Sequence, residues 1–263
     1  MNLIKSASLL ILITISFLYS CEKGCIKGDG PIVTQTIQLS SFDEVELAEA
    51  ANVIITQGPI QEVRVSAQQN VIDHLNRSVS GSYWSIDLGN KCFSDYDMTV
   101  YITVPNMKNI RLSGSGSIIV NEFSDQTNLY VGLSGSGNID LNQINACDNL
   151  TINISGSGII DLLSMDSCKN ILVNISGSGD VNTHQNLSAL KTLDIKISGS
   201  GSYVGFPAVS ENCIIKVSGS GDCKVNVINS LNVNISGSGN VYYKGNPSIT
   251  QNISGSGNVI NAN

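Results

Sequence analysis

Ile175-Ser176-Gly177-Ser178-Gly179 is one of eight near-identical Ser-Gly motifs that lie between residues 112 and 257. The first glycines of the eight Gly-Ser-Gly triplets are Gly114, Gly135, Gly156, Gly177, Gly199, Gly219, Gly237 and Gly255. Sequence rich in glycine and serine is typical of flexible linkers. The residues around the triplets decide whether that interpretation holds.

The positions before each triplet repeat as well, which a linker has no reason to maintain. The position two before the first glycine is aliphatic in every copy. The position four before it is aliphatic in every copy except the last, where it is Gln251. The position between them never carries a large apolar residue: Arg111, Gly132, Asn153, Asn174, Lys196, Lys216, Asn234 and Asn252. Alternation of period two marks a strand buried on one face. Each copy therefore contains a strand.

The spacing of the triplets indicates how these strands are arranged. Successive triplets are 21, 21, 21, 22, 20, 18 and 18 residues apart. A period near 20 is typical of a solenoid, in which each coil buries its apolar face by stacking on the next. No helical pattern separates the strands. We therefore predict an all-β fold, a single-stranded parallel β-helix with a less regular N-terminal β segment.

Two explanations for the glycines remain open. If the alternation continues through the triplet, both glycines face the interior, where opposite walls approach closely, and the serines face out. Alternatively the triplet is a corner at positive φ, which glycine adopts at little cost. The role of the glycine is steric in both cases, so Gly177→Val should destabilise the fold.

The segment before the repeats keeps the character of β structure. Residues 36–109 lack the motif, but alternation persists at Trp84–Leu88 and Met98–Val104. We predict that this segment forms irregular first coils or a cap over an edge that would otherwise be open. One helical turn is expected around Ala67–Leu75. The regular repeats then occupy residues 110–263.

The N-terminus has the features of an export signal. Lys5 precedes an apolar run from Ala7 to Leu18 that is short for a membrane span. The run ends in Leu18-Tyr19-Ser20-Cys21, which is similar to a bacterial lipobox. We predict a lipoprotein signal peptide over residues 1–20 and lipidation of Cys21, with an ordinary disulfide cysteine as the alternative.

Lipidation would place the protein on a membrane without crossing it. Residues 21–35 are predicted as a tether, and Glu22-Lys23-Gly24 lacks the aspartate that tends to retain lipoproteins at the inner membrane. The expected location is the outer membrane of a Gram-negative bacterium, facing either the cell surface or the periplasm.

Charge and cysteine spacing argue against several classes of function. The net charge is −7 and no basic patch stands out, which argues against nucleic acid as a partner. The cysteines other than Cys21 form no CxxC and no Cys/His cluster, so no metal or cofactor is expected. Their pairing is left open: Cys25, Cys92, Cys147, Cys168, Cys213 and Cys223. Cys147 and Cys168 are expected to stack in adjacent coils, as a disulfide or as two buried thiols.

A carbohydrate-active enzyme resembling a polysaccharide lyase is the alternative function, because β-helices also carry such activities. These sites need convergent carboxylates, or a basic residue beside a metal. We place four candidate acids mostly in different columns, with only the last two sharing one, two coils apart: Asp140, Asp161, Asp180 and Asp222. His74 and His184 are expected to be isolated at the surface. No catalytic residue is assigned, and the prediction is that the protein is not an enzyme.

Four stretches together resemble a known family: Phe42–Val45, Ala51–Gly58, Val100–Pro105 and Leu112–Gly116. They are similar to the secreted bacterial domain called "putative auto-transporter adhesin, head GIN domain", over most of the chain from about residue 36. The resemblance implies a right-handed β-helix on exported, often lipid-anchored, Gram-negative envelope proteins, and a GIN-type domain over residues 36–263. It supplies no catalytic residues.

The expected function is that of a non-enzymatic, lipid-anchored adhesin or surface-binding scaffold. A rigid rod that displays ladders of Ser, Asn and Lys suits weak multivalent contact with glycans or with other cell-surface proteins. The expected partners are therefore glycans, other cell-surface proteins and, through the lipid anchor, the membrane. No oligomeric state is predicted.

Overall fold

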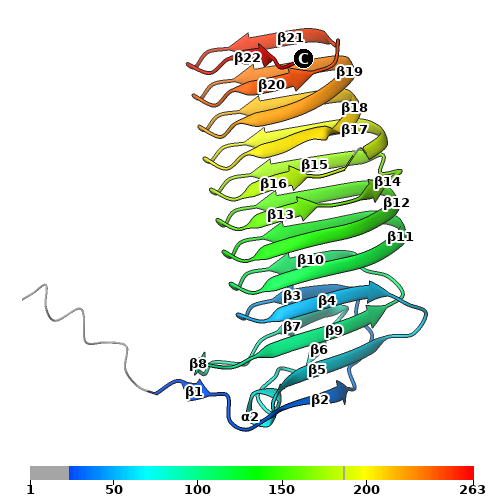
Figure 1. Ribbon diagram of the computed structural model, residues 1–263, viewed down its shortest axis with the longest axis vertical. Helices are drawn as coiled ribbons and strands as arrows, with labels where there is room; N and C mark the ends of the chain where they lie inside the picture. Colours follow the sequence, from blue (N-terminus) through cyan, green and yellow to red (C-terminus); the bar gives the residue numbers. More distant parts are fainter. Residues whose placement is uncertain (1–23, 186) are drawn as a thin grey trace, which may run out of the picture.

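The computed structural model describes residues 24–185 and 187–263. It is a β-solenoid of about seven turns, in which strands cross the long axis and each coil stacks on the previous one (Figure 1). Among the described residues, no helix is long and apolar enough to cross a membrane. Cys21 and the predicted signal peptide lie outside the described residues.

The elements fall into an N-terminal part and a repeat part. The N-terminal elements are β1 (Ile26–Lys27), β2 (Ile32–Ile37), β3 (Glu44–Leu47), β4 (Asn52–Gln57), β5 (Glu62–Gln68), α2 (Gln69–Ile72), β6 (Val79–Ser80), β7 (Tyr83–Ile86), β8 (Phe93–Ser94) and β9 (Met98–Val104). The repeat elements are β10 (Asn109–Leu112), β11 (Ser117–Leu133), β12 (Asn138–Ile154), β13 (Ile159–Leu162), β14 (Met165–Asp166), β15 (Asn170–Ile175), β16 (Asp180–Thr183), β17 (Leu187–Ile197), β18 (Tyr203–Val217), β19 (Cys223–Ile235), β20 (Val241–Lys244), β21 (Ser248–Ile253) and β22 (Val259–Asn261).

The predicted parallel β-helix is confirmed by the register of these strands. One wall of the solenoid is formed by the strand segments before the triplets, and the other wall by the segments after them. On the first wall, Val131 lies beside Ile152, and Ile152 lies beside Val173 in the next coil. All three side chains are buried. The aliphatic columns predicted from the sequence are therefore continuous ladders, whose burial favours folding by about 25 cal/mol per Å² of apolar surface.

The Ser-Gly triplets form the corners between the two walls, and each of the two explanations for their glycines is partly right. The triplet is a corner, but its glycines do not have positive φ. Ser155 and Ser157 are exposed and Gly158 is buried, as interior-facing glycines predict, but Gly156 is only half-buried. A Cβ on Gly158 would nevertheless meet the carbonyl oxygen of Gly137 well inside the 3.0 Å that real Cβ contacts respect. The close approach is therefore to the coil beneath, along the axis, rather than to the opposite wall.

The first coils do not stack in chain order. β3 pairs in parallel with both β7 and β10, and β4 pairs in parallel with both β9 and β11. The coil of β3 and β4 is therefore inserted between the coil of β7 and β9 and the first Ser-Gly coil (Figure 1). The chain makes this excursion through β5, which pairs antiparallel with β2 and β9. The N-terminal β segment is therefore less regular than the repeats, as predicted.

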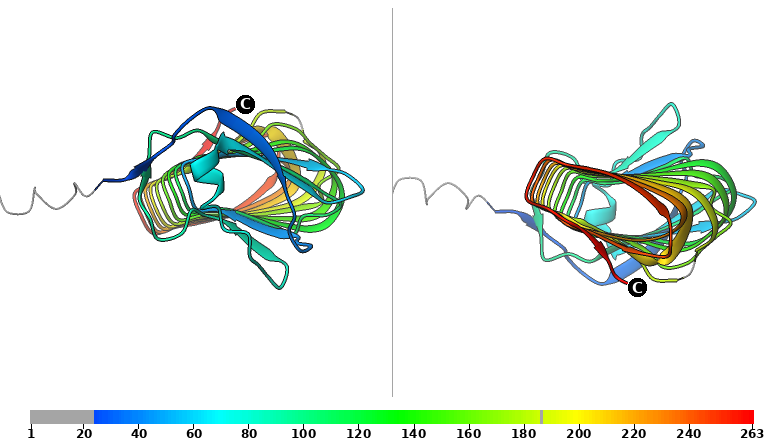
Figure 2. Two further views of the ribbon diagram at one scale, coloured as in Figure 1. Left: turned by 90° about the horizontal axis from the view of Figure 1, so that it is seen from below. Right: turned by 90° about the horizontal axis from the view of Figure 1, so that it is seen from above.

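The N-terminal end of the core is closed by local structure. The helical turn expected around Ala67–Leu75 is present as α2, and its Val71 and Ile72 are buried. Figure 2 shows α2 lying across the end of the coils. Within the segment interpreted as a tether, β1 and β2 pair with β8 and β5, and Cys25 forms a disulfide with Cys92.

The other described cysteines are free and buried: Cys147, Cys168, Cys213 and Cys223. Of the two states considered for Cys147 and Cys168, the structure shows the pair of buried thiols. The two thiols lie against each other, and contact with Cys147 together with burial raises the pKa of Cys168. The thiol form of Cys168 is therefore favoured over its thiolate inside the core.

Candidate functional site

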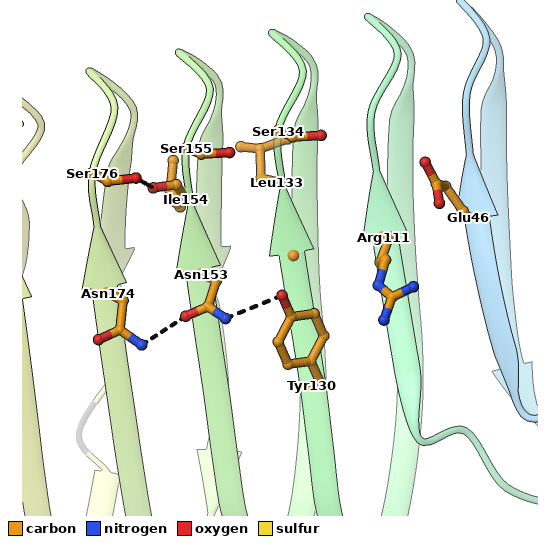
Figure 3. Close-up of a pocket in the computed structure, with 11 residues that line it drawn as sticks. Glu46, Arg111, Tyr130, Leu133, Ser134, Asn153, Ile154, Ser155, Asn174 and Ser176 are labelled. Atoms are coloured by element: carbon orange, nitrogen blue, oxygen red, sulfur yellow. Dashed lines mark hydrogen bonds between the residues drawn. The ribbon is translucent and has the colours of Figure 1, made fainter.

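A hollow lies on the outer surface of the wall before the triplets. Its volume is about 380 Å³. The side chains that give it chemical character come from five successive coils: Glu46, Arg111, Tyr130, Asn153 and Asn174. Figure 3 shows them side by side along the solenoid axis. The parallel register places four of them in one column with Gly132, and Tyr130 comes from the strand position two residues before Gly132.

Gly132 explains why the surface is hollowed here. It lies between Arg111 and Asn153 in the outward column three residues before the triplets. A Cβ on Gly132 would be 2.9 Å from Cε1 of Tyr130, which is closer than real Cβ contacts allow. The missing side chain therefore lets the Tyr130 ring lean over the strand. The phenol oxygen would lie only 3.2 Å from a Cβ at position 132, so the hydroxyl occupies space that a side chain there would have taken.

A chain of hydrogen bonds runs along the axis to this hydroxyl. Asn174 Nδ2 donates to Asn153 Oδ1 at 2.7 Å, and Asn153 Nδ2 donates to the Tyr130 hydroxyl oxygen at 3.0 Å. All three side chains are half-buried. Their positions are fixed because the strands that carry them are paired on both sides, so the donors and acceptors are displayed on a rigid surface.

Arg111 lies on the other side of the Tyr130 ring. Its guanidinium carbon is 5.6 Å from the ring centroid, within the range of a cation–π contact. Glu46, its register partner, accepts hydrogen bonds from the Tyr83 hydroxyl at 2.7 Å and from Ser113 Oγ. Burial and the bond to Glu46 raise the pKa of Tyr83. Among the described residues, no carboxylate lies within 4.0 Å of the guanidinium of Arg111, so its N–H groups remain available to a ligand.

This arrangement favours binding. A guanidinium, a phenol, two amides and the rim of triplet serines supply polar contacts around a shallow, partly apolar floor, as specific binding sites do. Sequence reasoning placed Arg111, Gly132, Asn153 and Asn174 in one outward column but did not single out Tyr130. The available signal was a glycine in a column that otherwise carries long polar side chains.

The structure contradicts two predictions about the candidate acids and histidines of the alternative enzyme. Asp140 and Asp161 are register partners in adjacent coils of the other wall, so the expectation that they occupy different columns is wrong. His184 is not isolated either, since its Nε2 lies 2.9 Å from Oδ1 of Asp161. Asn182 donates to the same oxygen at 3.0 Å. Burial and the neighbouring Asp161 charge raise the pKa of Asp140.

The remaining residues considered for catalysis have structural partners. Asp180 accepts from the backbone N–H of Ser202, and Asp222 accepts from that of Asn240, each at 2.7 Å, so both carboxylates support the next coil. His74 Nδ1 lies 2.8 Å from the carbonyl oxygen of Asn70. Within the described part of the chain, no three His, Cys, Asp or Glu side chains are grouped to hold a metal ion.

Solved structures share this architecture along almost their whole length. A "putative adhesin" of Parabacteroides distasonis aligns with a TM-score of 0.83 at 23% identity. A "putative lipid binding protein" of the same species aligns with a TM-score of 0.82 at 24% identity, and a "putative adhesin" of Parabacteroides merdae with 0.82 at 20%. Each alignment covers 90% of this chain and 99% of the other. At these identities the likeness shows the fold alone.

A comparison with curated proteins gave no match. Residues 41–247 match the family described as "Putative auto-transporter adhesin, head GIN domain". The matched region includes the inserted coil of β3 and β4, the hollow around Gly132 and all but the last of the Ser-Gly coils. The chain therefore belongs to the auto-transporter adhesin head GIN domain family.

Proposed function

We propose that this protein is a non-enzymatic, lipid-anchored binding protein of the Gram-negative outer membrane. In this proposal Cys21 carries the anchor, and the wall before the triplets contacts glycans or other cell-surface polymers. The observation that carries the proposal is the row from Asn174 through Asn153 and Tyr130 to Arg111, in which polar groups are presented at coil spacing on a rigid wall. The family name and the names of two of the similar structures agree with an adhesive role.

Binding is favoured over catalysis by the character of the acidic cluster on the other wall. The side chains of His184 and Asp161 are 49% and 26% exposed, so solvent screens their interaction. A glycoside-cleaving site requires an acid and a base that converge on one enclosed bond. The hollow at Gly132 instead presents hydrogen-bond donors and an aromatic ring.

Two measurements test the proposal. Growth with a palmitate analogue should label the wild-type chain and leave Cys21→Ser unlabelled, and protease added to intact cells should degrade the chain from outside. The full chain applied to a glycan array should bind through the wall before the triplets, and Asn153→Asp combined with Asn174→Asp should reduce that binding. An unlabelled, protease-protected chain that binds no glycan and no cell-surface protein would contradict the proposal.

A further inference from the structure

We propose that the hollow at Gly132 is a subsite for one anionic group, a carboxylate or a sulfate, of a polysaccharide that lies along the solenoid axis. This inference rests on the proposed function and adds the chemistry of the ligand. It follows from the direction of the hydrogen bonds around the hollow, from the unpaired guanidinium beside it and from the charges farther along the same column.

The hydrogen-bond chain ends in a free donor. Asn153 donates to the oxygen of the Tyr130 hydroxyl, so the proton of that hydroxyl is left to be donated. No acceptor for it occurs among the described residues. Because amide donors all point the same way along the row, from Asn174 to Tyr130, the hydroxyl at the end of the row is best matched by an acceptor-only ligand group.

Arg111 supplies further donors to the same place. Its guanidinium faces the Tyr130 ring at 5.6 Å and has five N–H groups in a planar fork that matches a carboxylate or a sulfate. Glu46 forms no ion pair with it within 4.0 Å, because the two oxygens of that carboxylate accept from the Tyr83 and Ser113 hydroxyls instead. The ring holds the guanidinium in place while leaving its N–H edge open (Figure 3). A phenol donor and a guanidinium donor therefore line the same hollow.

The same column carries more positive charge farther along the axis. Asn174 is followed in register by Lys196, whose Nζ lies 3.8 Å from Asp194 Oδ2, and then by Lys216; both lysines are exposed. Arg111 and Lys196 are four coils apart, which at about 4.8 Å per coil is about 19 Å. An extended polymer with anionic groups at intervals can therefore contact both ends of the row, and the amides between them can bind its hydroxyl groups.

The charge of the whole chain limits the kind of polyanion. A net charge of −7 repels a polymer with one phosphate per residue, whereas a polysaccharide with isolated carboxylates or sulfates encounters mainly the local charges of the row. The serine hydroxyls at the rim and the partly apolar floor also suit sugar rings. An acidic polysaccharide fits the site better than a nucleic acid.

Titration of the purified full chain with two matched pairs of polymers tests the inference. Lightly sulfated dextran is compared with dextran, and partly methyl-esterified polygalacturonate with its full methyl ester. We expect the anionic member of at least one pair to bind at least about tenfold more tightly than its neutral partner. Which pair discriminates tells a sulfate site from a carboxylate site, and inorganic phosphate should compete only weakly because it contacts a single subsite.

Variants then assign the binding to the hollow. Arg111→Gln should weaken binding of the anionic polymer about tenfold or more, and Tyr130→Phe, which removes only the hydroxyl, should weaken it several-fold. The matched control is Lys224→Gln on the other wall, since Lys224 also lies over a tyrosine ring, that of Tyr242, at 6.0 Å. This control should leave binding unchanged. Arg111→Gln should melt at the same temperature as the parent, because Arg111 faces outward.

The outcomes separate this inference from the proposed function. Equal weakening by Arg111→Gln and Lys224→Gln would indicate diffuse attraction and overturn the subsite. Binding of neutral glycans that is insensitive to Arg111→Gln would also overturn it, while the proposed function would stand. Failure to bind any polysaccharide would overturn the subsite and the glycan-binding part of the proposed function together.

Discussion

The corner at Ala48–Ala51 and the corner at Ser113–Gly116 have the same place in successive coils, yet only the second contains glycine. Leu47 and Leu112 are register partners before the two corners, and Asn52 and Ser117 are partners after them. The residue in the place of Gly114 is Glu49, which carries a full side chain. The shape of the corner therefore does not by itself require glycine.

The difference lies in what is beneath each corner. Beneath Gly114 lies the backbone of the inserted coil, and a Cβ there would overlap the carbonyl oxygen of Glu49. Beneath Glu49 lies the wide loop between β7 and β9. Its Leu88 N–H donates to Glu49 Oε1 at 2.9 Å, and its Tyr96 hydroxyl donates to Glu49 Oε2 at 3.3 Å. Glycine is required only where one tight corner is stacked on another.

The largest expected effect comes from adding a Cβ to a stacked corner. In Gly177→Val, and in the smaller change Gly177→Ala, the new atom would collide with the carbonyl oxygen of Gly156, which is backbone and cannot move aside. We expect a loss of about 3 kcal/mol or more in the free energy of unfolding. Thermal and denaturant unfolding measure it.

The matched control for this prediction is Glu49→Gln in the first corner. It keeps a side chain of the same size and can still accept from Leu88, so we expect a change of about 1 kcal/mol or less. If Gly177→Ala unfolds like the parent, the axial contact is not the reason for the glycines.

The second prediction concerns how each region is held together. The disulfide between Cys25 and Cys92 joins residues 67 positions apart, whereas the repeats are held by stacking alone. Replacing both cysteines with serine should cost about 2–4 kcal/mol. Because each coil contacts only its neighbours, the loss should be confined to the N-terminal coils. Hydrogen exchange resolved by region measures it.

Cys213→Ala is the control in the repeats, since it removes a buried thiol that forms no disulfide. It should produce a smaller change, located in the repeats. Equal loss of protection along the whole chain after removal of the disulfide would show that the two regions unfold as one unit.

The smallest expected effect concerns pH: one carboxylate in the N-terminal coils and one in the repeats should contribute to the stability of the fold with opposite pH dependence. Hydrogen bonds from Ser85, Asn76 and the Gly89 N–H outweigh the opposing effect of burial and lower the pKa of Asp87 in the N-terminal coils. Asp87 therefore stabilises the fold above its ordinary pKa of 3.8, and this contribution is lost as pH falls through the lowered value. Asp87→Asn should lower the melting temperature at about pH 7 and have less effect at about pH 3.

Asp140 in the repeats behaves in the opposite way. Burial and Asp161 raise its pKa, so its contribution is present below the ordinary value of 3.8 and is lost as pH rises through the raised value. Asp140→Asn should therefore raise the melting temperature slightly at about pH 7. Melting temperatures that shift in the same direction for both variants at neutral pH would show that the two carboxylates do not differ as described.

The repeats could be predicted closely because their signals are local. The aliphatic positions before Gly156 and Gly177 recur at a fixed spacing. The alternation of apolar and polar residues also predicts which face of each strand is buried. The helical turn at α2 was also visible. The contact between Asp161 and His184 was missed, because it joins residues 23 positions apart whose proximity depends on the length of the coil.

The hollow was predictable only in part. Arg111, Asn153 and Asn174 could be assigned to one outward column. The reach of Tyr130 over Gly132 could not, because it depends on side-chain direction and on the space that a neighbouring coil leaves. The same limit applies to the disulfide between Cys25 and Cys92, whose partners are adjacent only after β1 has paired with β8.

The sequence by itself determined the parallel β-helix, its period and the face of each strand that is buried, since alternation and repeat length act within one coil. The tertiary structure alone decided the insertion of the β3–β4 coil, the glycine-free corner at Glu49 and the meeting of Arg111 with Tyr130. Those features depend on which coil lies beneath which. Stacking along the axis sets that order, and the order of residues in the chain does not.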